Sequence, residues 1–311
     1  MDLVFFGSDN FAVPALGALA GSRHKILCVV TQPDRKKGRH LKLSATPVKE
    51  AALRLKLKVF QPESMNSPAA LAHLKGLRPD LLVVVAYGQI LSSAAIALPK
   101  IMPINLHASL LPALRGAAPI NWAIIKGENK TGVTVMKITQ KMDAGPLIAR
   151  KELAIAPDDT APALEAKLAV AGDKLLVDCV DRIEKSDFQL EAQDESAATF
   201  APKLKKEDGR IDWSKSAEMV YNLIRGCADW PAAHTRYRGG MLKIHQARLI
   251  QGTGGQVSGN GEIIKVGKEG IEVACGKGSL LIIRMQPEAR RSMSAAEFIA
   301  GHKIKTGERF S

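Results

Sequence analysis

The feature that most constrains the fold is the alternation of short apolar runs with segments of helical spacing across the first 150 residues. Residues 80–86 form the clearest run, which is continuous and rich in branched side chains, as is typical of the middle of a parallel sheet. Segments of helical character, such as 11–19 and 47–57, separate the runs. This alternation predicts right-handed crossovers and a doubly wound α/β sheet. The other predicted strands are residues 3–6, 26–31, 59–60, 104–107 and 133–138.

The chain changes character after a long predicted helix at residues 161–184. The stretch that follows is polar and aperiodic and contains Pro202, which indicates a linker. Beyond it, one helix at 216–225 precedes short alternating segments separated by glycines, a pattern that predicts a small β-barrel. We therefore expect two domains, residues 1–187 and 207–311, joined by a linker at 188–206.

The net charge of the chain is +13, and a net +9 of it lies between Arg23 and Lys58. The densest part, residues 34–39, falls in a predicted loop. Charge runs often do no more than solvate a helix face, but a basic loop favours contact with the phosphates of a nucleic acid. The hydrophobic share of 46% and the charged share of 24% are ordinary globular values and exclude general disorder.

The sequence predicts a cytoplasmic protein without a membrane span. Its longest apolar run, residues 81–87, is far shorter than the ~20 residues that a spanning helix needs, and the N-terminal residues do not resemble a secretory signal. The four cysteines lie dozens of residues apart and form no CxxC pair, which argues against a zinc cage and a disulfide framework and fits a reducing compartment.

Two common nucleotide sites are disfavoured by the residues present. The first predicted strand is followed by Gly7, and the position of the second glycine of a dinucleotide motif is Asp9, whose charge would repel a pyrophosphate. The chain also has no Walker sequence. We therefore expect neither a nicotinamide or flavin dehydrogenase nor ATP-driven chemistry of the Walker type.

Three polar residues form the candidate catalytic group. Asn105 and His107 lie two residues apart at the end of a predicted strand, so they face the same side of the sheet, at the edge where such sheets bind ligands. Asp143 follows the predicted strand 133–138 in a Gly/Pro turn, from which it would orient His107. A strand histidine is more often a core residue, and an aspartate in such a turn usually caps it.

An amide donor, an acid–base imidazole and a carboxylate are suited to direct group transfer, in which an acceptor substrate supplies the nucleophile. No serine is placed to act as a nucleophile, and the seven histidines show no metal-ligand spacing, so no metal is expected. The apolar, turn-prone stretch 109–116 follows directly, and it is read as a pocket wall or, alternatively, as a plain connecting loop.

Residues 105–112 (NLHASLLP) with 115–120 (RGAAPI) resemble the signature of the formyltransferases that use 10-formyltetrahydrofolate. Further stretches, at residues 31–35, 84–88, 193–196 and 211–214, narrow the resemblance to the members that formylate methionine on initiator tRNA. The similarity as a whole runs from Gly7 to about Phe310, essentially the entire chain. The resemblance implies a Rossmann-like formyl-transfer domain followed by an OB-like barrel, a 10-formyltetrahydrofolate cosubstrate, initiator methionyl-tRNA as partner, and a monomer.

The resemblance also implies roles for individual residues. The catalytic trio is Asn105, His107 and Asp143. The folate site is formed by Ser109, Leu110, Leu111 and Pro112, together with a loop that meets the pterin through its backbone: Val85, Ala86, Tyr87, Gly88 and Gln89. The basic insertion at 34–49 resembles the loop that grips the acceptor end of the tRNA, and its candidate residues are Arg35, Lys36, Lys37, Arg39 and Lys42.

Two departures from the family pattern leave the trio intact. The usual Gly-Leu-Asp-Thr-Gly around the aspartate is here residues 141–145 (KMDAG), and a common glutamine is replaced by Asn121. Two other interpretations stay open: a folate-dependent transferase acting on a small amine, such as glycinamide ribonucleotide or an aminosugar nucleotide, and a non-catalytic RNA-binding protein on the same folds. The first would leave the last hundred residues and the basic loop unexplained, and the second would have no need of the trio.

Overall fold

The computed structural model describes residues 1–37, 42–250 and 259–311. The described chain divides into two compact units. The first contains residues 1–119, 130–154 and 165–201, and the second contains residues 120–129, 155–164 and 202–311. The segment expected as a linker is thus shared, since residues 188–201 pack with the first unit and residues 202–206 with the second.

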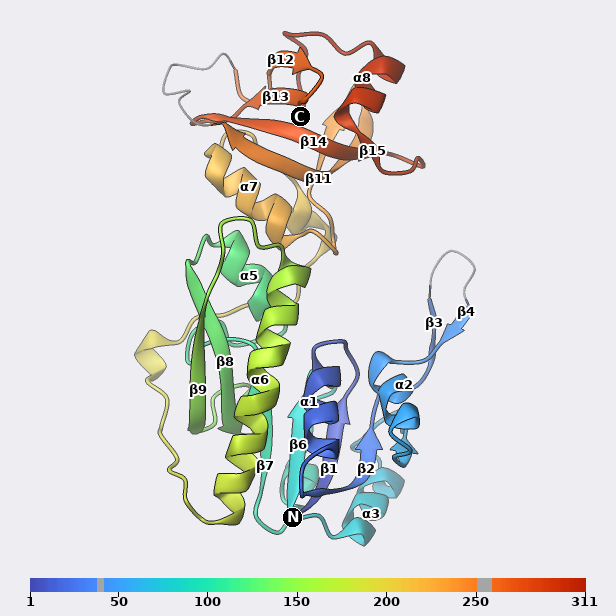
Figure 1. Ribbon diagram of the computed structural model, residues 1–311, viewed down its shortest axis with the longest axis vertical. Coiled ribbons are helices and arrows are strands. Elements are labelled where there is room, and N and C mark those ends of the chain that lie inside the picture. Colours follow the sequence, from blue (N-terminus) through green and yellow to red (C-terminus); the bar gives the residue numbers. More distant parts are fainter. Residues whose placement is uncertain (38–41, 251–258) are drawn as a thin grey trace. The chain divides into compact units, whose positions relative to one another are not determined.

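A seven-stranded sheet in the order β5-β2-β1-β6-β7-β8-β9 forms the first unit (Figure 1). The five strands from β5 to β7 are parallel, as predicted, whereas β8 runs antiparallel to both β7 and β9. A buried strand has a continuous apolar run in either orientation, so the sequence could not reveal this reversal. The strands are β1 (Asp2–Gly7), β2 (Lys25–Val30), β5 (Val59–Phe60), β6 (Leu81–Val85), β7 (Met102–His107), β8 (Lys130–Lys137) and β9 (Leu147–Ala154).

Helices cover this sheet, and several begin at a residue suited to cap them. Thr46, Ser67 and Ser92 each accept a hydrogen bond from a backbone N–H three residues further on, and a proline follows the first two caps. These caps start α2 (Pro47–Arg54), α3 (Pro68–Leu77) and α4 (Ser93–Ile96). The first unit also contains α1 (Ala12–Ala20) and most of α6 (Ala161–Glu184), whereas α5 (Pro119–Ile125) belongs almost entirely to the second unit.

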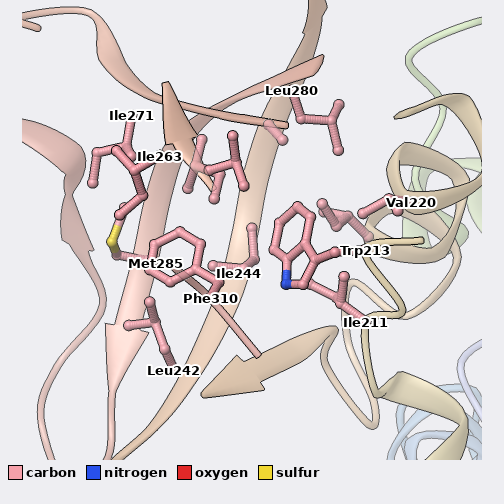
Figure 2. Packing of buried hydrophobic residues seen from close by; sticks show 14 of the residues in the cluster. Ile211, Trp213, Val220, Leu242, Ile244, Ile263, Ile271, Leu280, Met285 and Phe310 are labelled. Atoms are coloured by element: carbon pink, nitrogen blue, oxygen red, sulfur yellow. The ribbon is translucent and has the colours of Figure 1, made fainter. Parts of the chain in front are cut away.

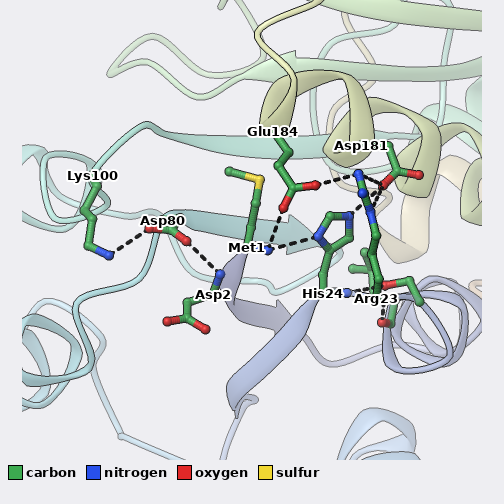
Figure 3. Close-up of polar contacts among 10 residues, drawn as sticks. Met1, Asp2, Arg23, His24, Asp80, Lys100, Asp181 and Glu184 are labelled. Carbon is green, nitrogen blue, oxygen red and sulfur yellow. Dashed lines mark hydrogen bonds and ion pairs between the residues drawn. The ribbon is translucent and has the colours of Figure 1, made fainter.

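An ion-pair cluster fastens the sheet to the last turns of α6 (Figure 3). The Met1 amino group donates to His24 Nδ1 at 3.2 Å and to Glu184 at 3.1 Å, while His24 Nε2 donates to Asp181 at 3.0 Å. Arg23 pairs with both carboxylates. His24, Asp181 and Glu184 lie close enough together to hold a metal ion, but these cationic partners already balance their charge.

The described residues of the predicted basic loop form a short β-hairpin. β3 (Arg35–Lys37) pairs antiparallel with β4 (Lys42–Ser44), so that Lys37 lies opposite Lys42. At its foot, Lys49 forms an ion pair of 2.6 Å with Asp34, whose carboxylate also accepts from Gln61 at 2.8 Å. Both hydrogen bonds hold the pKa of Asp34 below its ordinary value.

The second unit is built on an antiparallel sheet in the order β10-β11-β14-β13-β12, with β15 beside β14. Trp213, Ile244 and Phe310 are among the side chains that fill its core (Figure 2). The predicted short strands are confirmed as β10 (His234–Tyr237), β11 (Gly240–Ile250), β12 (Ile263–Gly267), β13 (Gly270–Ala274) and β14 (Ser279–Pro287), accompanied by β15 (Met293–Ser294), α7 (Ala217–Gly226) and α8 (Ala295–His302).

The last residues of the chain join the two edges of this sheet. Ser311 exchanges two backbone hydrogen bonds with Arg236 in β10, and the N–H of Ile263 in β12 donates to the carbonyl of Glu308. The edge strands β10 and β12 therefore both pair with residues 308–311. This pairing at both edges agrees with the barrel that the sequence pattern predicts. Within the described residues, no helix has the length and apolar character needed to cross a membrane.

Candidate active site

The end of β7 presents Asn105 and His107 on one face of the sheet, as the alternation predicted. Leu106 points to the other face, where a side-chain carbon added at Gly172 of α6 would lie only 2.8 Å from it. Packing against the helix thus fixes which face carries the two polar residues. Asn105 is partly exposed, and within the described part of the chain its amide has no hydrogen-bond partner.

His107 is 7% exposed, and its two ring nitrogens have different surroundings. Nε2 lies 3.0 Å from the backbone carbonyl of Leu114, which can only accept, so Nε2 carries a proton. Nδ1 faces Asp143, with 3.8 Å between Nδ1 and the nearer carboxylate oxygen. That separation is too long for a direct hydrogen bond and short enough for strong attraction between a carboxylate and an imidazolium.

Asp143 reaches His107 by a route that the sequence did not indicate. Because β8 is antiparallel to β7, its carboxyl end lies beside Ile104 rather than beside His107. The loop of residues 138–146 therefore carries the aspartate to the histidine. Asp143 has a φ of +50°, and its carboxylate accepts the backbone N–H of Gly116 at 2.9 Å.

The predicted folate segment 109–112 is held by its own hydrogen bonds. The buried Ser109 hydroxyl donates to the Ala113 carbonyl at 2.6 Å, and the Thr134 hydroxyl donates to the Ser109 carbonyl at 2.6 Å. Leu111 is fully buried, whereas Leu110 and Pro112 are partly exposed. Ser109 and Leu111 therefore shape the loop, and the surface it offers comes from Leu110 and Pro112.

The predicted pterin loop also offers backbone rather than side chains. Ala86 and Gly88 are exposed with φ of +45° and +85°. Between them, Tyr87 is 2% exposed and packs edge-on against Phe6, and burial raises the pKa of its phenol to about 12. The loop ends are tied down: Val85 is fully buried, and the Gln89 side chain bonds the backbone of residues 63 and 65.

Of the predicted tRNA-contacting residues, Arg35 and Lys36 are exposed on β3. Lys37 and Lys42 occupy the facing ends of the hairpin strands. Arg39 lies outside the described residues. The described members of this group are thus collected on a single hairpin.

The structure adds a polar cluster to which the sequence assigned no role. Gln193 and Glu195, in the segment expected as a linker, bond the guanidinium of Arg115, which is only 2% exposed. Gln193 also bonds the loop that carries Asp143. The motif around Gln193 was visible in the sequence. Its contacts were not, because Gln193 bonds Asp143, 50 positions away, and Arg115, 78 positions away.

The fold is that of a formyl transferase. The family model described as "Formyl transferase" matches residues 1–180, and the model of its C-terminal domain matches residues 203–303, so the chain belongs to the formyl transferase family. Within that family it groups with the methionyl-tRNA formyltransferases. The relative of that name from Trichlorobacter lovleyi is 44% identical over 98% of this chain and 95% of its own length.

Two further comparisons agree. The methionyl-tRNA formyltransferase of Acetivibrio thermocellus is 43% identical, and the match covers 99% of each chain. Among solved structures, the sugar 3N-formyl transferase WlaRD, crystallised with dTDP and 5-N-formyl-THF, superposes with a TM-score of 0.68 at 17% identity. The match covers 94% of this chain and 99% of WlaRD, and at that identity it speaks for the fold.

Proposed function

We propose that the chain transfers the formyl group of 10-formyltetrahydrofolate to the α-amine of methionine on initiator methionyl-tRNA. The observation that carries the proposal is the approach of Asp143 to His107 Nδ1, 3.8 Å away, beside an Asn105 amide left open on the same face of the sheet. A carboxylate, an imidazole and an amide donor are what an acyl transfer between two nitrogens requires.

In the mechanism that we propose, the neutral amine attacks the formyl carbon and forms the new C–N bond. The oxygen of the tetrahedral intermediate gains negative charge, which the Asn105 amide stabilises by a hydrogen bond. The bond from carbon to N10 of the folate then breaks, and the proton lost by the amine ends on N10. The transfer is direct, because the acceptor amine itself supplies the nucleophile and no enzyme side chain takes up the formyl group.

In this mechanism the two nitrogens of His107 have different tasks. Since the Leu114 carbonyl holds the proton on Nε2, only Nδ1 is free to interact with the reacting groups. The Asp143 carboxylate lies 3.8 Å from Nδ1 and so orients this side of the ring. The Gly116 N–H in turn keeps that carboxylate in place.

We assign the binding surfaces as follows. The backbone of residues 85–89 and the segment 109–112 hold the folate, because Ala86 and Gly88 of the first and Leu110 and Pro112 of the second are accessible next to the strands that carry them. Arg35, Lys36, Lys37, Arg39 and Lys42 contact the acceptor end of the tRNA, and residues 207–311 contact its stem. The positive charge of the hairpin supports this assignment.

A formylation assay tests the function against its nearest rival. Purified protein with 10-formyltetrahydrofolate should formylate methionyl-initiator tRNA and should leave glycinamide ribonucleotide and an aminosugar nucleotide unmodified. Faster transfer to either small amine would overturn the assignment. A non-catalytic RNA-binding protein would transfer to none of the three, and calorimetry would then detect no folate binding.

We further propose that the protein works as a monomer in the cytoplasm. The family resemblance supports a monomer, and four buried, unpaired cysteines fit a reducing compartment. Light scattering during size-exclusion chromatography should give a mass near 33.4 kDa. A mass of twice that value would contradict the monomer.

A further inference from the structure

The loop that carries Asp143 needs an anchor from outside itself. Its aspartate has a left-handed backbone conformation, and its side chain is held by one N–H, from Gly116. A displacement of this loop by about 1 Å would separate Asp143 from His107 and slow the reaction by about 10²-fold. The inference that follows rests on the function proposed above.

The segment of residues 188–201, here called the strap, supplies that anchor through Gln193. The side-chain N–H groups of Gln193 donate to the carbonyls of Asp143 at 2.9 Å and of Gly145 at 2.7 Å. Its side-chain oxygen accepts from two nitrogens of Arg115, at 2.8 and 3.1 Å. One amide thus ties the aspartate loop to the segment that follows β7.

Arg115 also forms an ion pair with a second strap residue, Glu195. Its guanidinium donates two hydrogen bonds to the Glu195 carboxylate, at 2.9 and 3.2 Å. Glu195 also forms an ion pair of 2.5 Å with Lys141 of the aspartate loop. These two cations lower the pKa of Glu195 to about 2, so it stays ionised at neutral pH.

The strap backbone completes the connection. Thr199 accepts the N–H of Leu114 through its hydroxyl at 2.9 Å, and the N–H of Arg115 through its carbonyl at 2.9 Å. Leu114 is the residue whose carbonyl binds His107 Nε2. The strap therefore bonds both the residue that orients His107 and the loop that carries Asp143.

We propose that Gln193 is a positioning residue, which acts through Arg115 and the strap to set the Asp143 carboxylate against the His107 ring. Fold stability alone is a weak reason for this arrangement, since a buried guanidinium loses its hydration and ion pairs of this kind contribute little net stability. The contacts of Gln193 are instead concentrated on the two segments that the reaction must align.

The test compares Gln193→Glu with Glu191→Gln. The first variant keeps an oxygen that accepts from Arg115 but loses both donors, so it repels the carbonyls of Asp143 and Gly145. The second alters a strap side chain that pairs with Arg150 and does not contact the aspartate loop. We expect Gln193→Glu to lower kcat 10- to 100-fold with both KM values within twofold of the native enzyme, and Glu191→Gln to change neither.

A second readout does not depend on turnover. In the substrate-free protein labelled with ¹⁵N-histidine, the Nδ1 resonance of His107 should move in Gln193→Glu and stay in place in Glu191→Gln. Native-like kcat together with an unmoved resonance in Gln193→Glu would overturn the proposal. If the native protein fails to formylate methionyl-tRNA, the proposed function is wrong. The Nδ1 resonance of His107 would still test whether Gln193 positions Asp143 against the ring.

Glu195→Gln serves if Gln193→Glu does not fold, because Glu195 is exposed and the change removes only its charge. Weaker pairing with Arg115 and Lys141 should then lower kcat about threefold to tenfold at unchanged KM. An unchanged kcat in Glu195→Gln would count against the strap as a positioning element.

Discussion

At the scale of single residues, the two ring nitrogens of His107 differ. Nε2 is fixed by a hydrogen bond, whereas Nδ1 faces the Asp143 carboxylate. The Leu114 carbonyl fixes the ring orientation through Nε2, so a change at Asp143 acts only on Nδ1. Asn105 differs from His107 and Asp143, because its side-chain amide has no hydrogen-bond partner among the described residues. Removing it should therefore affect the reaction far more than the fold.

Asn105→Ala should lower kcat by about 10²- to 10³-fold, since the oxyanion loses a donor that acts mainly in the transition state. The urea midpoint should stay close to the native value because the Asn105 side chain bonds no other described residue. Steady-state formylation kinetics check the first expectation and circular dichroism the second. Asn260→Ala, an exposed change in the second unit, is the control. Near-normal kcat in Asn105→Ala would contradict the assigned role.

At the scale of elements, Gly116 connects the strap, the segment after β7 and the aspartate loop. Its φ is +121°, and a side-chain carbon there would lie 2.6 Å from the Ala201 carbonyl oxygen. Its N–H holds the Asp143 carboxylate. A larger residue at this position therefore disturbs the strap and Asp143 together.

Gly116→Ala should destabilise the protein by about 1–3 kcal/mol through backbone strain and should also lower kcat. Gly76→Ala is the matched control, because Gly76 lies in α3 and an added carbon there meets no atom within 4 Å. We expect that control to be stabilising by about 0.5–1 kcal/mol with unchanged kcat. Urea denaturation and formylation rates measure both variants, and equal behaviour of the two would refute the argument.

Sequence patterns predicted some elements of the site and missed others for identifiable reasons. The period of two placed Asn105 and His107 on one face because Leu106 had to pack inward. The path to Asp143 was wrong, because nothing in an apolar run distinguishes the antiparallel β8 from a parallel strand. Gln193 was assigned to a linker because its partners lie 48 or more positions away along the chain, and two of them are backbone carbonyls, which leave no side-chain pattern in the sequence.

At the scale of the whole molecule, the four cysteines behave as core side chains. Burial raises the pKa of Cys28 to about 11 and the pKa of each other thiol to about 12. An unfolded chain ionises these thiols near 9.0, their ordinary value, whereas the folded chain keeps them protonated. Their contribution to stability is therefore complete below pH 9 and is lost as the pH rises from 9 towards 12.

The free energy of unfolding should fall by about 1 kcal/mol per thiol between pH 9 and 10 from this cause. Urea titrations at both pH values, compared with a variant carrying alanine at all four positions, isolate the contribution. The native protein should also react slowly with a thiol reagent at pH 8 and rapidly in urea. An equal pH response in the two proteins would show that the thiols are not responsible.

Charge also acts over the whole chain. Because the proposed tRNA contacts are to phosphates, kcat/KM for methionyl-tRNA should fall steeply between about 50 and 200 mM salt. The KM for the folate should change much less. Replacing Arg35 and Lys36 by alanine should flatten the salt response, whereas Lys75→Ala, an exposed cation on α3, should leave it unaltered. A salt response shared by both substrates would argue against phosphate contact.

The strap has a practical consequence for anyone who wishes to graft another carboxyl-terminal module onto this sheet. A splice made after α6, where the polar stretch begins, would discard Gln193, Glu195 and Thr199 and leave Arg115 buried without its acceptors. The chimaera must retain residues up to Ala201, whose N–H still bonds the Arg115 carbonyl.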